Sequence, residues 1–118
     1  MGFFRFLAII PLLIALPSVH ATNSMDAEIR QLIAAVGRDG CQLIRNDRQY
    51  RAREAREHLR SKWELNEHLV NSTEDFIEKI ASRSATTGNV YLIDCEGQPI
   101  RPSGDWFQAL LAQIRNPQ

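Results

Sequence analysis

The two cysteines, Cys41 and Cys95, constrain this chain more than any other feature of its sequence. Only one pairing within the chain is possible, and Cys41 opens one predicted strand, Cys41–Arg45, while Cys95 closes another, Val90–Cys95. If these strands are neighbours, antiparallel pairing places the cysteines opposite each other, whereas parallel pairing separates them beyond disulfide reach. We therefore expect a structural disulfide within an antiparallel sheet, contributing about 4 kcal/mol for a loop of this length.

Two free thiols or an intermolecular bond are the alternatives to this disulfide. A redox role is disfavoured because the closely spaced thiols of a C-x-x-C motif are absent from the sequence. A disulfide needs an oxidising compartment, so the cysteine pair and the cellular location of the chain are linked predictions.

The N-terminus has the three-part pattern of a secretory signal peptide. A basic start, Met1–Arg5, precedes the apolar run Phe6–Leu16, and Pro17–Ala21 then offers small residues for cleavage after Ala21. As a helix, the apolar run spans about 16 Å, roughly half of a bilayer core, which disfavours a membrane anchor. We expect residues 1–21 to be removed and the mature protein to be periplasmic or secreted, without stable membrane insertion.

Charge and composition exclude several function classes. The chain has 14 basic and 14 acidic residues, and cleavage removes one arginine, so no net positive field attracts nucleic acid. Two cysteines and three histidines are too few for a zinc finger or an iron–sulfur protein, and we expect neither a metal site nor a cofactor. Residues 22–118, about 97 in number, suit one domain with a small core.

The hydrophobic pattern of the mature region predicts an α+β fold. Apolar residues spaced three and four apart predict four helices, which begin near Met25, Arg51, Thr73 and Ser103. Ser72 and Ser103 are the expected caps of the last two helices, and Asn46-Asp47 is an expected turn. With the two cysteine-bearing strands and a third short strand at Gln98–Arg101, we predict about four helices on a small antiparallel sheet of two or three strands.

Several stretches of the chain resemble one known family. They are Ile44-Arg45-Asn46 with Tyr50, Glu54-Ala55, His58-Leu59, Lys62, the long segment Thr73–Tyr91, and Pro102–Trp106. In these stretches, which span about residues 30–115, the chain is similar to the YfeK-like family of small exported proteobacterial proteins, whose domain has no assigned function. The resemblance implies an exported location and supplies no mechanism.

One helix carries a candidate proton-transfer site. Glu54, His58 and Lys62 are spaced four residues apart in the predicted helix Arg51–Leu65 and share one face. With Glu54 orienting it, His58 is a candidate general base. The alternative is an ordinary ion pair on a solvated helix, which the absence of an identifiable nucleophile and oxyanion site favours.

The polar segment Ser82–Gly88 is the candidate ligand-binding loop. Four hydroxyls and one cation lie close together there, on Ser82, Arg83, Ser84, Thr86 and Thr87. With backbone N–H groups, they suit a carboxylate, a sugar or a phosphate. The alternative is a turn whose hydroxyls bond the local backbone.

The sequence does not identify a catalytic set, so the leading hypothesis is a non-catalytic binding or interaction module of the cell envelope. Its partner would be an envelope protein, a peptide or a glycan. The main alternative is a small hydrolase or transferase that uses His58 with a hydroxyl of the 82–88 loop. A third possibility is a purely structural protein without a polar pocket.

Overall fold

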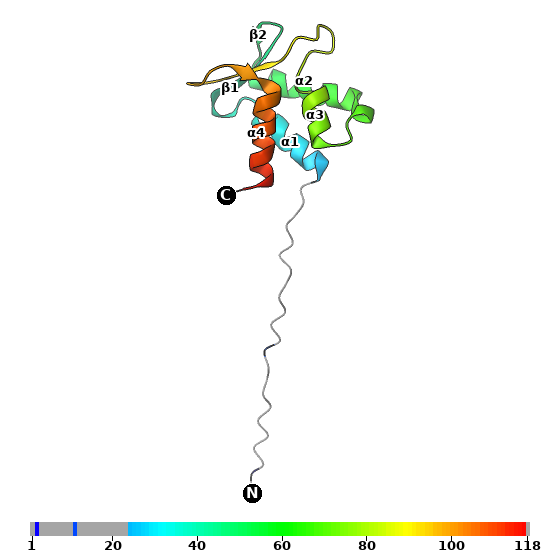
Figure 1. Cartoon of the computed structure of the whole chain (residues 1–118), viewed down its shortest axis with the longest axis vertical. Helices are drawn as coiled ribbons and strands as arrows, with labels where there is room; N and C mark the ends of the chain where they lie inside the picture. Colours follow the sequence, from blue (N-terminus) through cyan, green and yellow to red (C-terminus); the bar gives the residue numbers. More distant parts are fainter. Residues whose placement is uncertain (1, 3–10, 12–23, 118) are drawn as a thin grey trace.

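The computed structural model describes residues 24–117, together with Gly2 and Pro11 (Figure 1). The expected signal-peptide cleavage site lies outside the described residues. The helices are α1 (Met25–Ala35), α2 (Ala52–Leu65), α3 (Thr73–Lys79) and α4 (Ser103–Arg115), with 3₁₀ turns at Arg38–Gly40 and Glu67–Leu69. No helix in the described part of the chain combines the length and the apolar character needed to cross a membrane.

The four strands form one antiparallel sheet in the order β2-β1-β3-β4. Their bounds are β1 (Cys41–Arg45), β2 (Arg48–Gln49), β3 (Leu92–Cys95) and β4 (Arg101–Pro102). The predicted α+β class and the antiparallel pairing are therefore confirmed. The sheet has one more strand than expected because β2 is only two residues long and carries no hydrophobic alternation.

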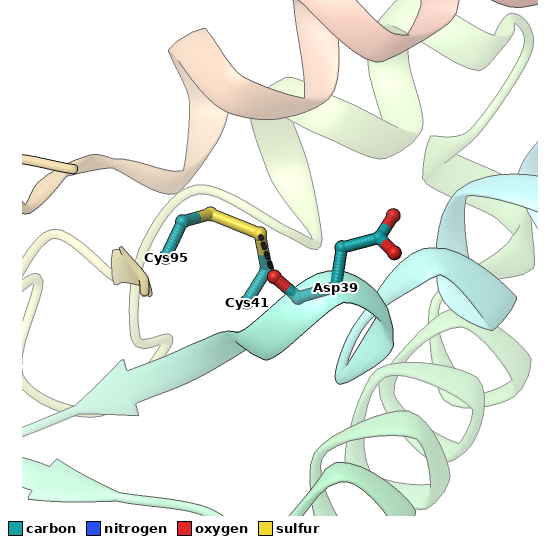
Figure 2. The surroundings of a disulfide bond; sticks show 3 residues. All are labelled: Asp39, Cys41 and Cys95. Carbon is teal, nitrogen blue, oxygen red and sulfur yellow. Dashed lines mark hydrogen bonds between the residues drawn. A yellow bond between two sulfur atoms is a disulfide. The ribbon is translucent and has the colours of Figure 1, made fainter. Parts of the chain in front are cut away.

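The predicted disulfide between Cys41 and Cys95 is present, and Figure 2 shows it at the start of β1. The two cysteines are directly paired residues of β1 and β3, as the antiparallel argument requires. The Asp39 carbonyl oxygen lies 4.0 Å from the Cys41 sulfur. This is a van der Waals contact, because a disulfide sulfur carries no proton to donate.

The predicted turn at Asn46-Asp47 joins β1 to β2 in a tight hairpin. Both turn residues have positive φ, 49° at Asn46 and 65° at Asp47. Two consecutive residues in the left-handed region form the turn type that matches the twist of antiparallel strands. Asparagine and aspartate tolerate this conformation better than other non-glycine residues, which explains their presence here.

The core lies between the sheet and the helices. Leu43 of β1 and Ile93 of β3 are fully buried on the face that also carries the disulfide. Helices α1, α3 and α4 contact one another, and α2 contacts both α1 and β1. Fully buried side chains on these helices include Ile29, Leu32, Leu59, Phe76 and Phe107.

Two serines near helix starts behave differently from each other. Ser72 caps α3 as predicted, since its hydroxyl accepts a hydrogen bond from the Asp75 N–H at 3.0 Å. The expected cap at Ser103 is wrong: α4 begins at Ser103 itself, after Pro102. The buried Ser103 hydroxyl instead donates to the Ala81 carbonyl at 2.6 Å. This hydrogen bond joins the start of α4 to the residues that follow α3.

Candidate functional site

A hollow of about 280 Å³, which we call the α2–loop pocket, lies between α2, the end of β1 and the 82–88 loop. His58 and the 82–88 loop, the two features singled out in the sequence, border this one pocket. Its polar and charged lining residues are Arg45, His58, Ser61, Lys62, Asn66, Ser84, Thr86 and Tyr91. Leu65 and Ala85 complete the lining, in which there is no carboxylate side chain.

Arg45 enters the pocket from the inner face of the sheet. Because side chains alternate along a strand, Arg45 shares the face of the buried residues Cys41 and Leu43. Its guanidinium carbon lies 4.8 Å from the centre of the Tyr50 ring and 5.6 Å from that of Tyr91. Its Nε atom is buried and has no hydrogen-bond partner among the described residues. The cation is thus held by two aromatic rings and retains an unused donor.

A chain of hydrogen bonds runs through the buried hydroxyl of Tyr91. The Lys62 ammonium donates to this hydroxyl at 3.3 Å, and the His58 Nε2 atom also lies 3.3 Å from it. Lys62 donates in addition to the carbonyls of Ile80 at 2.8 Å and Arg83 at 2.6 Å. Lys62 therefore uses its three donors to join α2 to the segment that follows α3.

Burial and like charge determine the protonation states in the pocket. Burial, and then the charges of Arg45 and Lys62, lower the pKa of His58 from 6.5 to about 4. Burial, and then the charge of Arg45, lower the pKa of Lys62 from 10.5 to about 8. Burial also raises the pKa of Tyr91 above its ordinary value of 10. At neutral pH the pocket therefore holds a neutral imidazole, an ammonium, a guanidinium and a phenol.

The hydrogen bond between His58 and Tyr91 leaves one further donor in this pair. The Tyr91 oxygen accepts from Lys62, and the neutral His58 ring either accepts the Tyr91 hydroxyl proton at Nε2 or donates to the same oxygen through Nε2–H. In the first arrangement the free donor is the Nδ1–H group of His58, and in the second it is the Tyr91 hydroxyl.

The 82–88 loop is fixed at both its pocket side and its outer side. On the pocket side, the Ser84 and Thr86 hydroxyls lie 3.1 Å apart, so one donates to the other. On the outer side, the Thr87 hydroxyl donates to the Asn46 side-chain oxygen at 2.8 Å, and the Asn89 amide donates to the same oxygen at 3.2 Å. The tip of the β1–β2 hairpin therefore holds the loop that closes the pocket.

The remaining candidate residues lie outside the pocket lining. The Ser82 hydroxyl donates to the Ile77 carbonyl, and Arg83 contributes its backbone carbonyl to Lys62. Glu54 does not orient His58: its carboxylate pairs with Arg48 at 3.3 Å, on the exposed surface. With Thr87 bonded to the hairpin, only Ser84 and Thr86 of the loop candidates face the pocket.

Sequence reasoning missed Arg45 and Tyr91 as residues of the site. A signal was present, because strict alternation from Cys41 through Leu43 places Arg45 at an inward position of a strand. Charged residues at inward positions are uncommon and need a specific environment. The register of β1 against β3, which brings Tyr91 beside Arg45, was not available from one sequence.

A second hollow, of about 400 Å³, lies beside the disulfide between α1, α4 and the sheet. Its lining includes Arg38, Arg101, Trp106 and Ala109. Among residues 24–117, no three His, Cys, Asp or Glu side chains come together as metal ligands would.

Comparison with known proteins identifies a family. No curated protein matches the chain. No solved structure matches it either. A family model described as a family of unknown function, DUF5329, matches residues 23–115, which includes every residue of the α2–loop pocket. The disulfide is consistent with an oxidising compartment. The chain therefore belongs to the DUF5329 family.

Proposed function

We propose that this protein is an exported, non-catalytic binding module of the cell envelope and that the α2–loop pocket is its ligand site. The observation that carries the proposal is the convergence of His58, Arg45 and the 82–88 loop on one preformed hollow. A concave site with a few convergent polar groups is the usual form of a small-molecule site. The signal-peptide pattern and the resemblance to the YfeK-like family support the exported location.

The hydrogen bonding of His58 favours binding over catalysis. The imidazole Nε2 faces the Tyr91 hydroxyl at 3.3 Å, while the Ser84 and Thr86 hydroxyls pair with each other. A nucleophilic hydroxyl needs the base within hydrogen-bond reach. A pKa of about 4 also makes His58 a weak base at neutral pH, since an effective general base has a pKa near the working pH.

A thermal-shift screen with two blocking variants tests the proposal. The panel contains small carboxylates, phosphates, amines, neutral sugars and short peptides. Ala85→Trp fills the α2–loop pocket from an exposed position, and Ala109→Trp fills the hollow beside the disulfide as a matched control. We expect at least one compound to raise the melting temperature of the wild type and of Ala109→Trp but not of Ala85→Trp.

Two outcomes would count against the proposal. One is a panel in which no compound stabilises the wild type. The other is a stabilisation that survives Ala85→Trp and disappears in Ala109→Trp. Turnover of a bound compound that is lost in His58→Gln would support the alternative, a small hydrolase or transferase.

A further inference from the structure

The α2–loop pocket has a charge imbalance that a ligand can correct. Arg45 and Lys62 bring two positive charges to its walls, and no carboxylate lines it. The ion pairs of the described residues involve other cations, namely Arg48, Arg53, Lys79 and Arg115. Two half-buried cations without a counter-charge repel each other, so an anion placed between them is favoured.

The two cations have different parts in such a site. Lys62 already donates to two carbonyls and to the Tyr91 hydroxyl, so it contributes its field rather than a free N–H group. Arg45 has its guanidinium over the rings of Tyr50 and Tyr91 and makes no hydrogen bond to a carboxylate. A guanidinium has five N–H donors in a planar fork, and a fork that is not paired with a carboxylate suits a planar or tetrahedral oxyanion.

Neutral donors supplement the guanidinium. The hydrogen-bonded pair of His58 and Tyr91 keeps one further donor, either the Nδ1–H group of His58 or the Tyr91 hydroxyl. Of the paired hydroxyls on Ser84 and Thr86, one donates to the other and the second keeps its proton for another acceptor. Together with two cations and no carboxylate in the lining, these donors fit an anion and disfavour a cationic ligand.

We propose that the α2–loop pocket binds an oxyanion, a carboxylate or a phosphate group, which Arg45 holds together with the His58–Tyr91 pair and a hydroxyl of the 84–86 segment. The hollow of about 280 Å³ accommodates such a group with a small substituent. The side chain of Leu65, 79% exposed at the pocket, offers an apolar surface to that substituent. This inference rests on the proposed function, because it names the class of ligand for the same pocket.

A set of matched aromatic ligands tests the charge requirement. Benzoate, phenyl phosphate and neutral benzyl alcohol share one ring and differ in the attached group. Each is titrated into the isotope-labelled protein at pH 7 and constant ionic strength, and NMR shifts give the dissociation constants. We expect at least one of the two anions to bind at least tenfold more tightly than the alcohol, and the tighter anion identifies the ligand chemistry.

Two pairs of variants test whether the preference for anions arises in the α2–loop pocket. Ala85→Glu and Ala85→Gln have nearly equal size at an exposed position of the pocket and differ in charge. We expect Ala85→Glu to weaken anion binding at least tenfold relative to Ala85→Gln. Arg45→Gln is expected to weaken anion binding similarly. Its control, Arg60→Gln, removes one exposed positive charge from helix α2 outside the pocket lining and should change anion binding by less than twofold. The Ala85 pair keeps the test valid if Arg45→Gln does not fold.

The results separate this inference from the proposed function. Equal affinities for benzyl alcohol and the anions, or equal anion binding by Ala85→Glu and Ala85→Gln, would overturn the oxyanion assignment and leave the pocket as a ligand site. If none of the three compounds moves a pocket resonance, while a neutral compound of the thermal-shift panel binds there, the oxyanion assignment fails alone. If no compound of either set binds in the pocket, both proposals fail.

Discussion

At the scale of single residues, Arg45 decides the chemistry of the pocket. Its neighbours on the same face of β1, Cys41 and Leu43, belong to the hydrophobic core. Strand alternation is readable in one sequence, so an inward arginine was predictable in principle once the strand bounds were known. Its partners Tyr50 and Tyr91 were not predictable, because they come from a hairpin and from a strand register that only the folded chain defines.

The burial of His58 predicts a pH-dependent stability. Its folded-state pKa of about 4 lies below the ordinary value of 6.5, so the unfolded chain binds a proton more readily between these two values. The stabilisation is therefore complete above pH 6.5 and is lost as the pH falls towards 4. Because His58 is only partly buried, solvent screening reduces the expected loss at pH 5 to about 1 kcal/mol.

Urea unfolding of the wild type and of His58→Gln at pH 7.5 and pH 5 measures this contribution. The wild type should lose about 1 kcal/mol more than the variant between the two pH values. Carboxylates such as Glu28 and Glu74, whose pKa values are lowered by Arg115, titrate in both proteins and cancel in the comparison. Equal losses in the two proteins would show that His58 titrates normally.

At the scale of elements, the tip of the β1–β2 hairpin positions the 82–88 loop. The sequence predicted the turn at Asn46-Asp47 and the loop itself, since both are rich in turn-forming polar residues. It did not predict that Asn46 holds Thr87 and Asn89, because that contact joins segments about 40 residues apart in the chain. Thr87 was predicted as a ligand-binding residue from its hydroxyl alone. In the structure, that hydroxyl bonds Asn46 instead.

Replacing Asn46 by glycine tests this coupling. Asn46→Gly keeps the positive φ of the turn and removes both side-chain hydrogen bonds to the loop. Backbone amides of residues 84–88 should exchange with solvent at least about tenfold faster, with little change in global stability. Asp47→Gly, a neighbouring positive-φ residue, is the matched control. Equal exchange in the two variants would show that the hairpin tip does not restrain the loop.

At the scale of the whole molecule, Arg115 joins the two ends of the described chain. Its guanidinium donates to the buried carboxylate of Glu28 in α1 at 2.9 and 3.0 Å and pairs with Glu74 of α3. Thr73 donates to the same Glu28 at 2.7 Å. Apolar spacing predicted the helices themselves, but not this polar clamp, whose members are separated by up to 87 residues.

Removing Arg115 leaves a buried carboxylate with fewer partners. Arg115→Gln is expected to destabilise the protein by about 2–4 kcal/mol, because Glu28 then loses its counter-charge in a buried position. Chemical denaturation measures the change, and Arg101→Gln, on an exposed residue without an ion pair among the described residues, is the control. A loss below about 0.5 kcal/mol would place the clamp among weak surface pairs.

The disulfide constrains the whole fold because it closes a loop of 54 residues between the central strands. Replacing both cysteines by serine should destabilise the protein by about 2–4 kcal/mol. The melting temperature of the purified protein in non-reducing buffer should fall by about 10 °C or more. An unchanged melting temperature would mean that the bond contributes nothing to stability.

The central claim is that the α2–loop pocket is where this protein binds its ligand, and residue-resolved NMR tests it most directly. The tightest compound of the thermal-shift panel is titrated into the isotope-labelled protein. We predict that the largest shift changes occur at Arg45, His58, Lys62 and residues 84–86. Changes concentrated at Arg38, Trp106 and Ala109, beside the disulfide, would contradict the account and place the site in the second hollow.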